Sequence, residues 1–216
     1  MEPNWGALKI MPTGETALKQ RRKLRLPKFE NLPLALFFRE FCRNPTMIGS
    51  IIPSSDKLID RMLSRIDWEG TRLFVEYGPG VGTFTRPILD QLAPDATLIA
   101  IDTNRDFIRY LEQTIDDPRL ILINGSAADV ASIIARHGFE HVDYVLSGLP
   151  FSTLPPGVGP AIMRETYKVL RPGGAFVIYQ YALKVLRLLK PYFANIDRDF
   201  EPINIPPAQV FWAWKD

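Results

Sequence analysis

The sequence predicts an α/β fold, a mainly parallel β-sheet with helices on both of its faces. Short β-branched runs alternate with helical stretches along most of the chain, as in successive βαβ units. A glycine-rich turn directly follows the first of these runs, where such folds press a ligand against bare backbone. With 216 residues, 46% hydrophobic and 23% charged, the chain can form one sizeable domain of this kind plus an appendage.

Five runs are expected to form parallel strands, and helical stretches separate or follow them. The strands are expected at 72–77, 97–102, 120–124, 142–147 and 175–180, and the helices at 83–92, 104–115, 128–137, 158–169 and 182–190. Ser54 or Ser55 is suited to N-cap an earlier helix through about residue 66. Two further runs, 194–203 and 209–215, flank Pro206 and Pro207 and are expected to pair antiparallel at the sheet edge. The result is a seven-stranded sheet.

Residues 1–54 are expected to form an extension in front of a main domain at 55–216. Residues 1–55 contain nine Lys or Arg and four Asp or Glu, a net charge of +5, whereas the remaining residues contain seventeen and twenty, a net charge of −3. Such a basic segment suits the phosphates of nucleic acid or of anionic lipid, and it also fits a solvated tail. Its six clustered cations are Lys19, Arg21, Arg22, Lys23, Arg25 and Lys28.

An apolar stripe follows the basic segment. Leu34, Phe37, Phe38 and Phe41 recur at helical spacing, and Asn44-Pro45 would end the helix. The stripe fits a helix lying in the surface of an anionic membrane, and equally a lid packed on the main domain. No apolar run approaches the roughly 18 residues of a membrane span, and no secretory signal is recognisable. The single cysteine excludes an internal disulfide and is compatible with the cytoplasm.

Residues 73–85, LFVEYGPGVGTFT, carry the strongest chemical signal. Glu76 ends a hydrophobic run, and Gly78, Gly80 and Gly82 form the turn before a helix. The third glycine comes one residue earlier than in the dinucleotide-binding fingerprint. Asp102 ends the second strand, 20 residues beyond Gly82, where a carboxylate can accept hydrogen bonds from both hydroxyls of a ribose and disfavours a 2′-phosphate. The pattern therefore argues against NADP.

This constellation resembles the Rossmann-like class I S-adenosylmethionine-dependent methyltransferases over residues 72–180. The resemblance implies S-adenosyl-L-methionine as cofactor, with S-adenosyl-L-homocysteine as product. It also implies roles for particular residues: the glycines would line the methionine portion, Glu76 would support their loop or the ammonium group, and Asp102 with Thr103 would hold the ribose. The remaining implied cofactor contacts are Tyr77, Ser126, Ala127, Ser147 and Leu149.

The segment 145–151, VLSGLPF, narrows the resemblance to bacterial phospholipid N-methyltransferases, relatives of the rRNA adenine dimethylases. Amine methyltransferases acting on adenine or glutamine have an amide-bearing residue where this chain has Ser147-Gly148, which disfavours a nucleobase substrate. The segments 49–55, GSIIPSS, and 179–181, YQY, agree with the resemblance. Ala182-Leu183 departs from it, since a Gly-Pro turn is expected there.

The resemblance implies N-methylation of phosphatidylethanolamine, and of its mono- and dimethyl forms, toward phosphatidylcholine. An ethanolamine ammonium must first lose a proton, which desolvation favours, and Tyr179, Tyr181 and Ser147 are the candidate acceptors of hydrogen bonds from the nitrogen. Aromatic rings at Phe151, Tyr181 and Tyr77 would tolerate a methylated ammonium. The candidate contacts to the lipid phosphate are Arg39, Arg43 and Arg86.

The expected location is cytoplasmic, peripheral to the inner face of the cell membrane, with anionic lipid as partner. Rival functions are an RNA adenine dimethylase, a small-molecule amine methyltransferase, and a non-catalytic binding module. His137 and His141 are too few for a metal site, so no metal is expected. Trp212 and Trp214 lie on the last strand, whose two faces are expected to be divided between the core and an interface or membrane.

Overall fold

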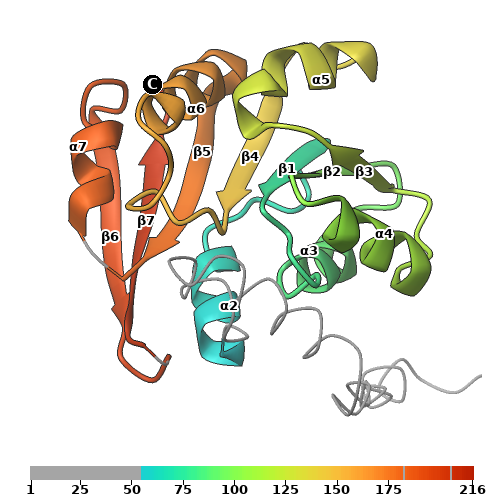
Figure 1. Ribbon diagram of the computed structural model, residues 1–216, viewed down its shortest axis with the longest axis horizontal. Coiled ribbons are helices and arrows are strands. Elements are labelled where there is room, and N and C mark those ends of the chain that lie inside the picture. The colour runs from blue at the N-terminus through green and yellow to red at the C-terminus, as the bar shows by residue number, and fades with distance from the viewer. Residues whose placement is uncertain (1–54, 182, 205) are drawn as a thin grey trace, which may run out of the picture.

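A computed structural model describes residues 55–181, 183–204 and 206–216 of the chain. The basic segment and the apolar stripe at 34–41, with Arg39 and Arg43, lie outside these residues. The described part contains a seven-stranded sheet in the order β3-β2-β1-β4-β5-β7-β6 (Figure 1). This is the predicted Rossmann-like α/β methyltransferase fold.

The strands begin and end close to the predicted positions. They are β1 (Leu73–Tyr77), β2 (Thr97–Asp102), β3 (Leu120–Asn124), β4 (Val142–Ser147), β5 (Leu170–Gln180), β6 (Asn195–Glu201) and β7 (Ala208–Trp214). Strands β1 to β5 pair in parallel, and β7 pairs antiparallel with both β5 and β6. The predicted antiparallel pair is thus at the edge, with β6 outermost and β7 between β6 and β5.

Strand β5 begins five residues before its predicted start. Its pairing with β4 jumps from Val142↔Leu170 to Tyr144↔Ala175, so the turn at 171–174 forms an irregularity within the strand. The amide of Gly173 donates to the carbonyl of Lys215 at 2.7 Å, and the Lys215 amide donates to Gly174 O at 2.9 Å. The end of the chain therefore holds a turn that the sequence places before the strand.

The helices alternate with the strands as expected. They are α2 (Asp56–Leu63), α3 (Thr85–Gln91), α4 (Arg105–Thr114), α5 (Val130–Arg136), α6 (Val158–Val169) and α7 (Leu186–Leu189), with short 3-10 turns at η2 (Ala127–Asp129) and η3 (Leu183–Val185). Ser55 caps α2, its hydroxyl accepting from the Leu58 amide at 3.2 Å. Asn104 caps α4 in the same way through the Asp106 amide.

Two hydrophobic cores cover the two faces of the sheet. Helices α5, α6 and α7 lie on one face, and α2, α3 and α4 lie on the other (Figure 1). Alternate residues of β1 point into each core: Val75 and Tyr77 pack with the first group of helices and Phe74 with the second. Glu76 shares the side of Phe74, so a carboxylate enters the α2–α4 face next to the glycine turn.

The edge strands are held to α2 by ion pairs. Arg61 pairs with Asp199 and Glu201 of β6, and Arg65 pairs with Asp197 at 2.6 Å. These carboxylates lie at alternate positions of β6 and therefore share the face toward α2. The strand is thus covered on this side by a helix that belongs to the start of the domain.

Strand β7 is buried on both faces, which corrects the expected division into a core face and an interface. Phe211, Trp212 and Ala213 are all fully buried. The indole of Trp212 donates to Met62 O at 3.1 Å, and Trp214 donates to Asp197. The reason is that Trp212 packs in the core with α2 while Phe211 and Ala213 pack in the core on the other face, with Leu189 of α7, which the sequence of β7 does not reveal.

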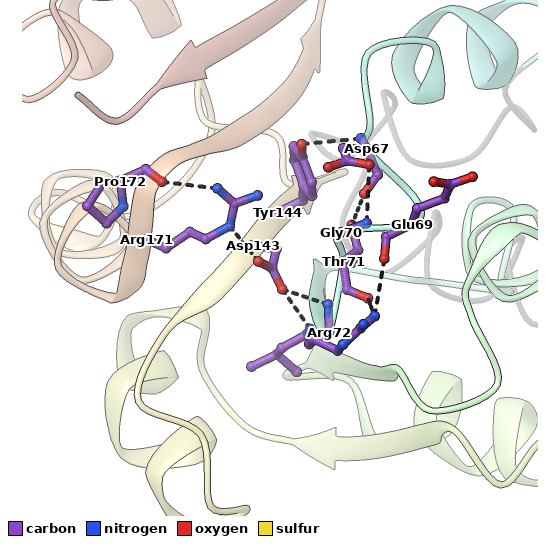
Figure 2. A network of polar contacts seen from close by, with 10 residues as sticks. Asp67, Glu69, Gly70, Thr71, Arg72, Asp143, Tyr144, Arg171 and Pro172 are labelled. Carbon is purple, nitrogen blue, oxygen red and sulfur yellow. Dashed lines mark hydrogen bonds and ion pairs between the residues drawn. The ribbon is translucent and has the colours of Figure 1, made fainter.

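A polar network anchors the amino ends of the central strands (Figure 2). One carboxylate oxygen of Asp143 accepts from the amides of Arg72 and Leu73 at 2.8 and 2.9 Å, and the other accepts from Arg171 Nε at 2.5 Å. Asp143 is 9% exposed, so these are largely desolvated bonds. They join β1, β4 and β5 at the edge opposite the functional loops.

Within the described residues, no helix has the length and apolar character needed to cross a membrane.

Candidate active site

The site lies at the carboxyl ends of β1, β2 and β4. Strand β1 has β2 on one side and β4 on the other, so the connections from these strands diverge at this point and leave a crevice for a ligand. Tyr77, the last residue of β1, is aligned with Ile101 on one neighbour and with Ser147 on the other. The glycine turn, the Asp102 loop and the loop after β4 therefore meet at one place.

The glycine turn has three residues with left-handed backbone, Gly78 at φ +67°, Gly80 at +56° and Gly82 at +85°. A Cβ on Gly78 would lie 2.9 Å from Leu149 Cδ2, and one on Gly82 would lie 2.9 Å from Leu111 Cδ2. A Cβ on Gly80 would meet no atom within 4 Å. The turn thus packs tightly at both ends and presents bare backbone in the middle, which fits a ligand lying against it.

Glu76 lies behind this turn and is 1% exposed. Its Oε2 accepts from the hydroxyl of Thr85, the first residue of α3, at 2.7 Å. Burial raises the pKa of Glu76 to about 8, the Thr85 bond opposes this shift, and the nearby Asp102 adds to it. The carboxyl group therefore ties the strand to the following helix across the turn.

Asp102 is positioned by backbone amides. Its two oxygens accept from the Asn104 amide at 2.8 Å and the Gly80 amide at 3.4 Å. Burial nevertheless raises its pKa to about 6. The side-chain amide of Asn124 donates to the backbone carbonyls of Asp102 and Thr103 at 3.0 and 3.1 Å, so the end of β3 fixes this loop.

The third loop approaches the second through its backbone. The Gly125 amide donates to Asp102 O at 3.0 Å. Ser126 Oγ accepts from the Ala128 amide at 3.2 Å and caps η2, and Ala127 is 7% exposed. Ser126 and Ala127 therefore lie beside the Asp102 loop in space, where the resemblance places contacts to adenine.

Three hydrogen bonds fix the start of the loop after β4, and a fourth orients the Gln180 side chain that makes one of them. The Gly148 amide donates to Tyr77 O at 2.9 Å, and the Leu149 amide donates to Ser147 Oγ at 3.2 Å. The side-chain amide of Gln180 donates to Leu149 O at 2.8 Å and to Tyr179 O at 2.6 Å. The ends of β1 and β5 thus hold this loop from both sides.

Gly148 lies between the cofactor turn and β5, where a side chain would have little room. A Cβ there would lie 3.1 Å from Gly78 O, 3.7 Å from Tyr179 Oη and 3.8 Å from Tyr77 O. Gly148 therefore lies beside oxygen atoms that can accept hydrogen bonds from an amine.

Two tyrosines at the end of β5 form an aromatic wall with α3. The Tyr179 ring lies 5.6 Å from that of Phe84 and 6.2 Å from that of Tyr181. Burial raises the pKa of Tyr181, whose hydroxyl is hydrogen-bonded to the side chain of Asn204. The structure thus brings Tyr179 beside Gly148 and joins Tyr181 to the β6–β7 connection.

Three side chains expected at the ligand point elsewhere. Tyr77 is fully buried, its ring is edge-on to Phe176, and its hydroxyl is 3.1 Å from Thr166 on α6. Phe151 also packs edge-on to Phe176, and Ser147 is 0% exposed. Alternation along β1 turns the Tyr77 side chain away from Glu76, and the Ser147 hydroxyl accepts a hydrogen bond within the loop. The roles of these three residues at the ligand stay predictions.

Arg86, expected at a lipid phosphate, donates to Thr114 O at 2.8 Å at the end of α4. His137 and His141 are exposed. Among residues 55–181, 183–204 and 206–216, no group of three or more metal-ligating side chains is found.

Sequence reasoning missed four residues that organise the site: Thr85, Asn124, Gln180 and Asn204. Asn124 had a usable signal, since it is a polar residue at the end of a strand, as Asp102 is. Gln180 lies inside the YQY segment but was not separated from its tyrosines. Thr85 donates a hydrogen bond to Glu76, 9 residues away in the sequence, and Asn204 accepts one from the Ser55 amide, 149 residues away. Neither contact has a local sequence signal.

Residues 74–174 match the family model of a methyltransferase domain. The chain is 32% identical over 180 residues to the ornithine lipid N-methyltransferase of Singulisphaera acidiphila, covering 82% of this chain and 94% of that protein.

Solved structures show the same fold. A precorrin-6y C5,15-methyltransferase from Geobacter metallireducens superposes with a TM-score of 0.61 at 13% identity, over 75% of this chain and 89% of that one. A Thermus thermophilus 16S rRNA N2 G1207 methyltransferase, solved with AdoMet and guanosine, superposes at 0.56 and 20% identity, over 74% and 42%.

The open backbone at Gly80, the carboxylate of Asp102 and the capped Ser126 loop fit the methionine, ribose and adenine portions of S-adenosylmethionine. With the family match and the fold, they establish it as the cofactor. The chain belongs to the class I S-adenosylmethionine-dependent methyltransferases, in one family with the ornithine lipid N-methyltransferase.

Proposed function

We propose that this methyltransferase N-methylates the primary amine of a membrane lipid. Phosphatidylethanolamine and its mono- and dimethyl forms are the proposed acceptors, toward phosphatidylcholine. The observation that carries the proposal is the position of Gly148, where even a Cβ would lie 3.1 Å from Gly78 O and 3.7 Å from Tyr179 Oη. The absence of a side chain lets two hydrogen-bond acceptors come together beside the cofactor turn, an arrangement suited to the N–H groups of a small aliphatic amine.

The cofactor would be held by the three loops described above. Gly78, Gly80 and Gly82 would line its methionine portion, Asp102 would accept from the ribose hydroxyls, and Ser126 with Ala127 would contact adenine. When bound, it supplies a methyl group on a sulfonium for in-line displacement by an amine. The protein's own contribution is to hold the acceptor nitrogen next to Gly148 at the correct angle.

The acceptor nitrogen must present a lone pair, although a free alkylamine is protonated near neutral pH. Loss of water around the nitrogen lowers its pKa, as for a buried lysine. Tyr179 Oη and the Gly78 carbonyl would accept hydrogen bonds from the neutral amine and direct its lone pair. Neither group needs to be a strong base, because the proton can leave to water before the nitrogen is enclosed.

The substrate class is supported by residues and by a relative. Ser147-Gly148 replaces the amide-bearing residue with which related enzymes grip a planar amino group, which favours an aliphatic amine over a nucleobase. The relative from Singulisphaera acidiphila is named for ornithine lipid, which makes that lipid the second candidate acceptor. Both candidates present an amine on a lipid headgroup.

The test is transfer of radiolabelled methyl groups to vesicles containing either phosphatidylethanolamine or ornithine lipid, followed by chromatography of the lipids. Label in mono-, di- or trimethylated phosphatidylethanolamine is expected. Label in ornithine lipid alone would change the substrate. If the protein binds the donor but labels neither lipid, lipid methylation is refuted. Transfer of label to ribosomal RNA would then support an RNA methyltransferase instead.

A Gly148→Ala variant tests the position of the acceptor. The added methyl group lies 3.1 Å from Gly78 O, so transfer is expected to fall by about tenfold or more while the fold is kept. Gly159→Ala in α6 is the matched control, because its methyl group lies 3.2 Å from the flexible end of Leu188 and at an ordinary van der Waals distance of 3.8 Å from Phe151. Equal transfer by both variants would contradict the proposed acceptor position.

A further inference from the structure

Three large apolar side chains are strongly exposed at one corner of the sheet. Leu183 is 48% exposed, Phe200 45% and Ile203 56%, and they are the exposed large hydrophobic residues of the described chain. Exposed apolar side chains gathered in one region mark binding surfaces more often than scattered ones do. Their location next to the active site makes them informative.

All three lie at the edge of the sheet where the site is. Phe200 is aligned with Gln209, which is aligned with Gln180 at the end of β5, and Leu183 follows three residues later. Figure 1 shows β5 and β6 ending at the same edge. Ile203 adjoins Asn204, whose side chain is hydrogen-bonded to Tyr181. The apolar corner therefore borders the acceptor side of the site.

The same corner is basic. Lys184 and Arg187 lie at the start of the segment that follows β5, and Arg198 lies on β6. All three are exposed, and none forms an ion pair within the described part of the chain.

The acidic residues of β6 do not neutralise this corner. Asp197, Asp199 and Glu201 point to α2, where Arg61 and Arg65 pair with them. Alternation places Arg198 and Phe200 on the opposite face, and Arg198 lies 5.8 Å over the ring of Phe211 in the core shared with α7. The face toward α7 thus carries uncompensated positive charge beside exposed apolar side chains.

We propose that this α7–β6 surface, formed by Leu183, Lys184, Arg187, Arg198, Phe200 and Ile203, binds an anionic lipid bilayer. The apolar side chains would enter the interface while the cations contact lipid phosphates. The open side of the site would then face the membrane, so that a headgroup can reach Gly148 without leaving the bilayer surface. This inference rests on the proposed lipid substrate and adds a docking surface separate from residues 1–54.

The test is co-sedimentation of the full chain with vesicles of phosphatidylcholine alone or with phosphatidylglycerol added. Binding to the anionic vesicles is expected to fall about tenfold or more for Arg187→Glu, because one attraction becomes a repulsion. Vesicle binding of Phe200→Ser is expected to fall several-fold, because less apolar surface is buried in the bilayer. Arg136→Glu is the matched control, since Arg136 is an exposed cation of α5 without an ion pair among the described residues, and it should bind as the wild type does.

Methyl transfer to lipid dispersed in neutral detergent micelles separates docking from chemistry. Arg187→Glu and Phe200→Ser should keep wild-type transfer there, because neither residue lies in the site. If both variants bind vesicles as well as the wild type does, the inference is overturned. This outcome includes the case in which residues 34–43 cover this corner. The inference would also be overturned if Arg136→Glu lost as much vesicle binding as Arg187→Glu, because the change in net charge alone would then explain the loss. Absence of transfer to any lipid would refute the proposed function and leave the vesicle result to be judged separately.

Discussion

The side-chain amide of Gln180 donates to the carbonyl oxygen of Leu149 over 2.8 Å, joining the end of β5 to the loop after β4. Leu149 in turn packs against Gly78, since a Cβ on that glycine would lie 2.9 Å from its side chain. This hydrogen bond, together with the one from the Gly148 amide to Tyr77 O, therefore fixes the distance between the acceptor position and the cofactor turn. Methyl transfer depends on this distance, because misplacement of the reacting atoms by about 1 Å can cost two orders of magnitude in rate.

Replacing Gln180 with Glu should impair methyl transfer more than donor binding. The new carboxylate would face the carbonyl oxygens of Leu149 and Tyr179, which would repel it and displace the loop. A fall in kcat/KM of about tenfold or more is expected. The measurement is steady-state transfer beside calorimetric donor titration, with Gln209→Glu as the control in the same row of the sheet. Equal losses in the two quantities would contradict a role in positioning the acceptor.

Replacing Gly80 with Ala should weaken donor binding with only a modest loss of stability. Its left-handed backbone makes the change cost about 1 kcal/mol, although the methyl group meets no protein atom within 4 Å. Gly138→Ala is matched in both respects, with φ +83° and open space, and lies far along the chain after α5. Thermal unfolding should give similar shifts for both variants, whereas calorimetry should show lower donor affinity for Gly80→Ala alone. The same affinity in both would exclude contact between the donor and Gly80.

Glu76 should make the free protein less stable as the pH rises from neutral to about 8. Its folded pKa of about 8 exceeds its ordinary value of 4.5, so the native state holds a proton that the unfolded state has released. The free energy of unfolding should therefore fall by up to about 1.4 kcal/mol per pH unit in this window and level off above it. Asp102 contributes with the same sign, but only up to about pH 6.

Urea unfolding between pH 6.5 and 8 isolates the Glu76 contribution. Glu76→Gln should flatten the pH dependence, because the variant cannot ionise, while the exposed control Glu140→Gln should retain it. Parallel slopes for wild type and Glu76→Gln would show that the carboxyl group is already ionised at neutral pH.

Asp143→Ala should destabilise the domain without changing transfer per folded molecule. The change removes the acceptor of the Arg72 and Leu73 amides and the partner of Arg171, at an expected cost of about 2–4 kcal/mol. Denaturant unfolding provides the measurement. The control is Asp95→Ala, an exposed carboxylate 3.8 Å from Arg72, which should change stability by less than about 0.5 kcal/mol. Similar losses of unfolding free energy in both variants would show that the hydrogen bonds to Asp143 stabilise the domain no more than an exposed ion pair does.

Local pattern was sufficient for the order of the strands and helices and for the cofactor loops. Hydrophobic periodicity located β1 to β4 within one residue, because a buried parallel strand must be apolar along its whole length. The spacing of Glu76, the three glycines and Asp102 was enough to predict a ligand with a free ribose at this turn, since positive φ and strand-end carboxylates are properties of single positions. The resemblance to class I methyltransferases then implied which cofactor this is.

Tertiary structure decided which of the remaining residues face the ligand. Tyr77, Ser147 and Phe151 are polar or aromatic residues at strand ends, yet packing turns their side chains into the core or the loop. Gln180 and Asn204 gain their roles through hydrogen bonds to Leu149 and Tyr181.

The burial of Trp212 on β7 likewise depends on α2, about 150 residues earlier in the chain. The sequence by itself determined the fold, because the periodicity of each element is a short-range requirement, and it indicated the cofactor through the family resemblance that its short motifs carry. The geometry around the acceptor, in contrast, depends on contacts between segments distant in the sequence, and only the folded chain brings these segments together.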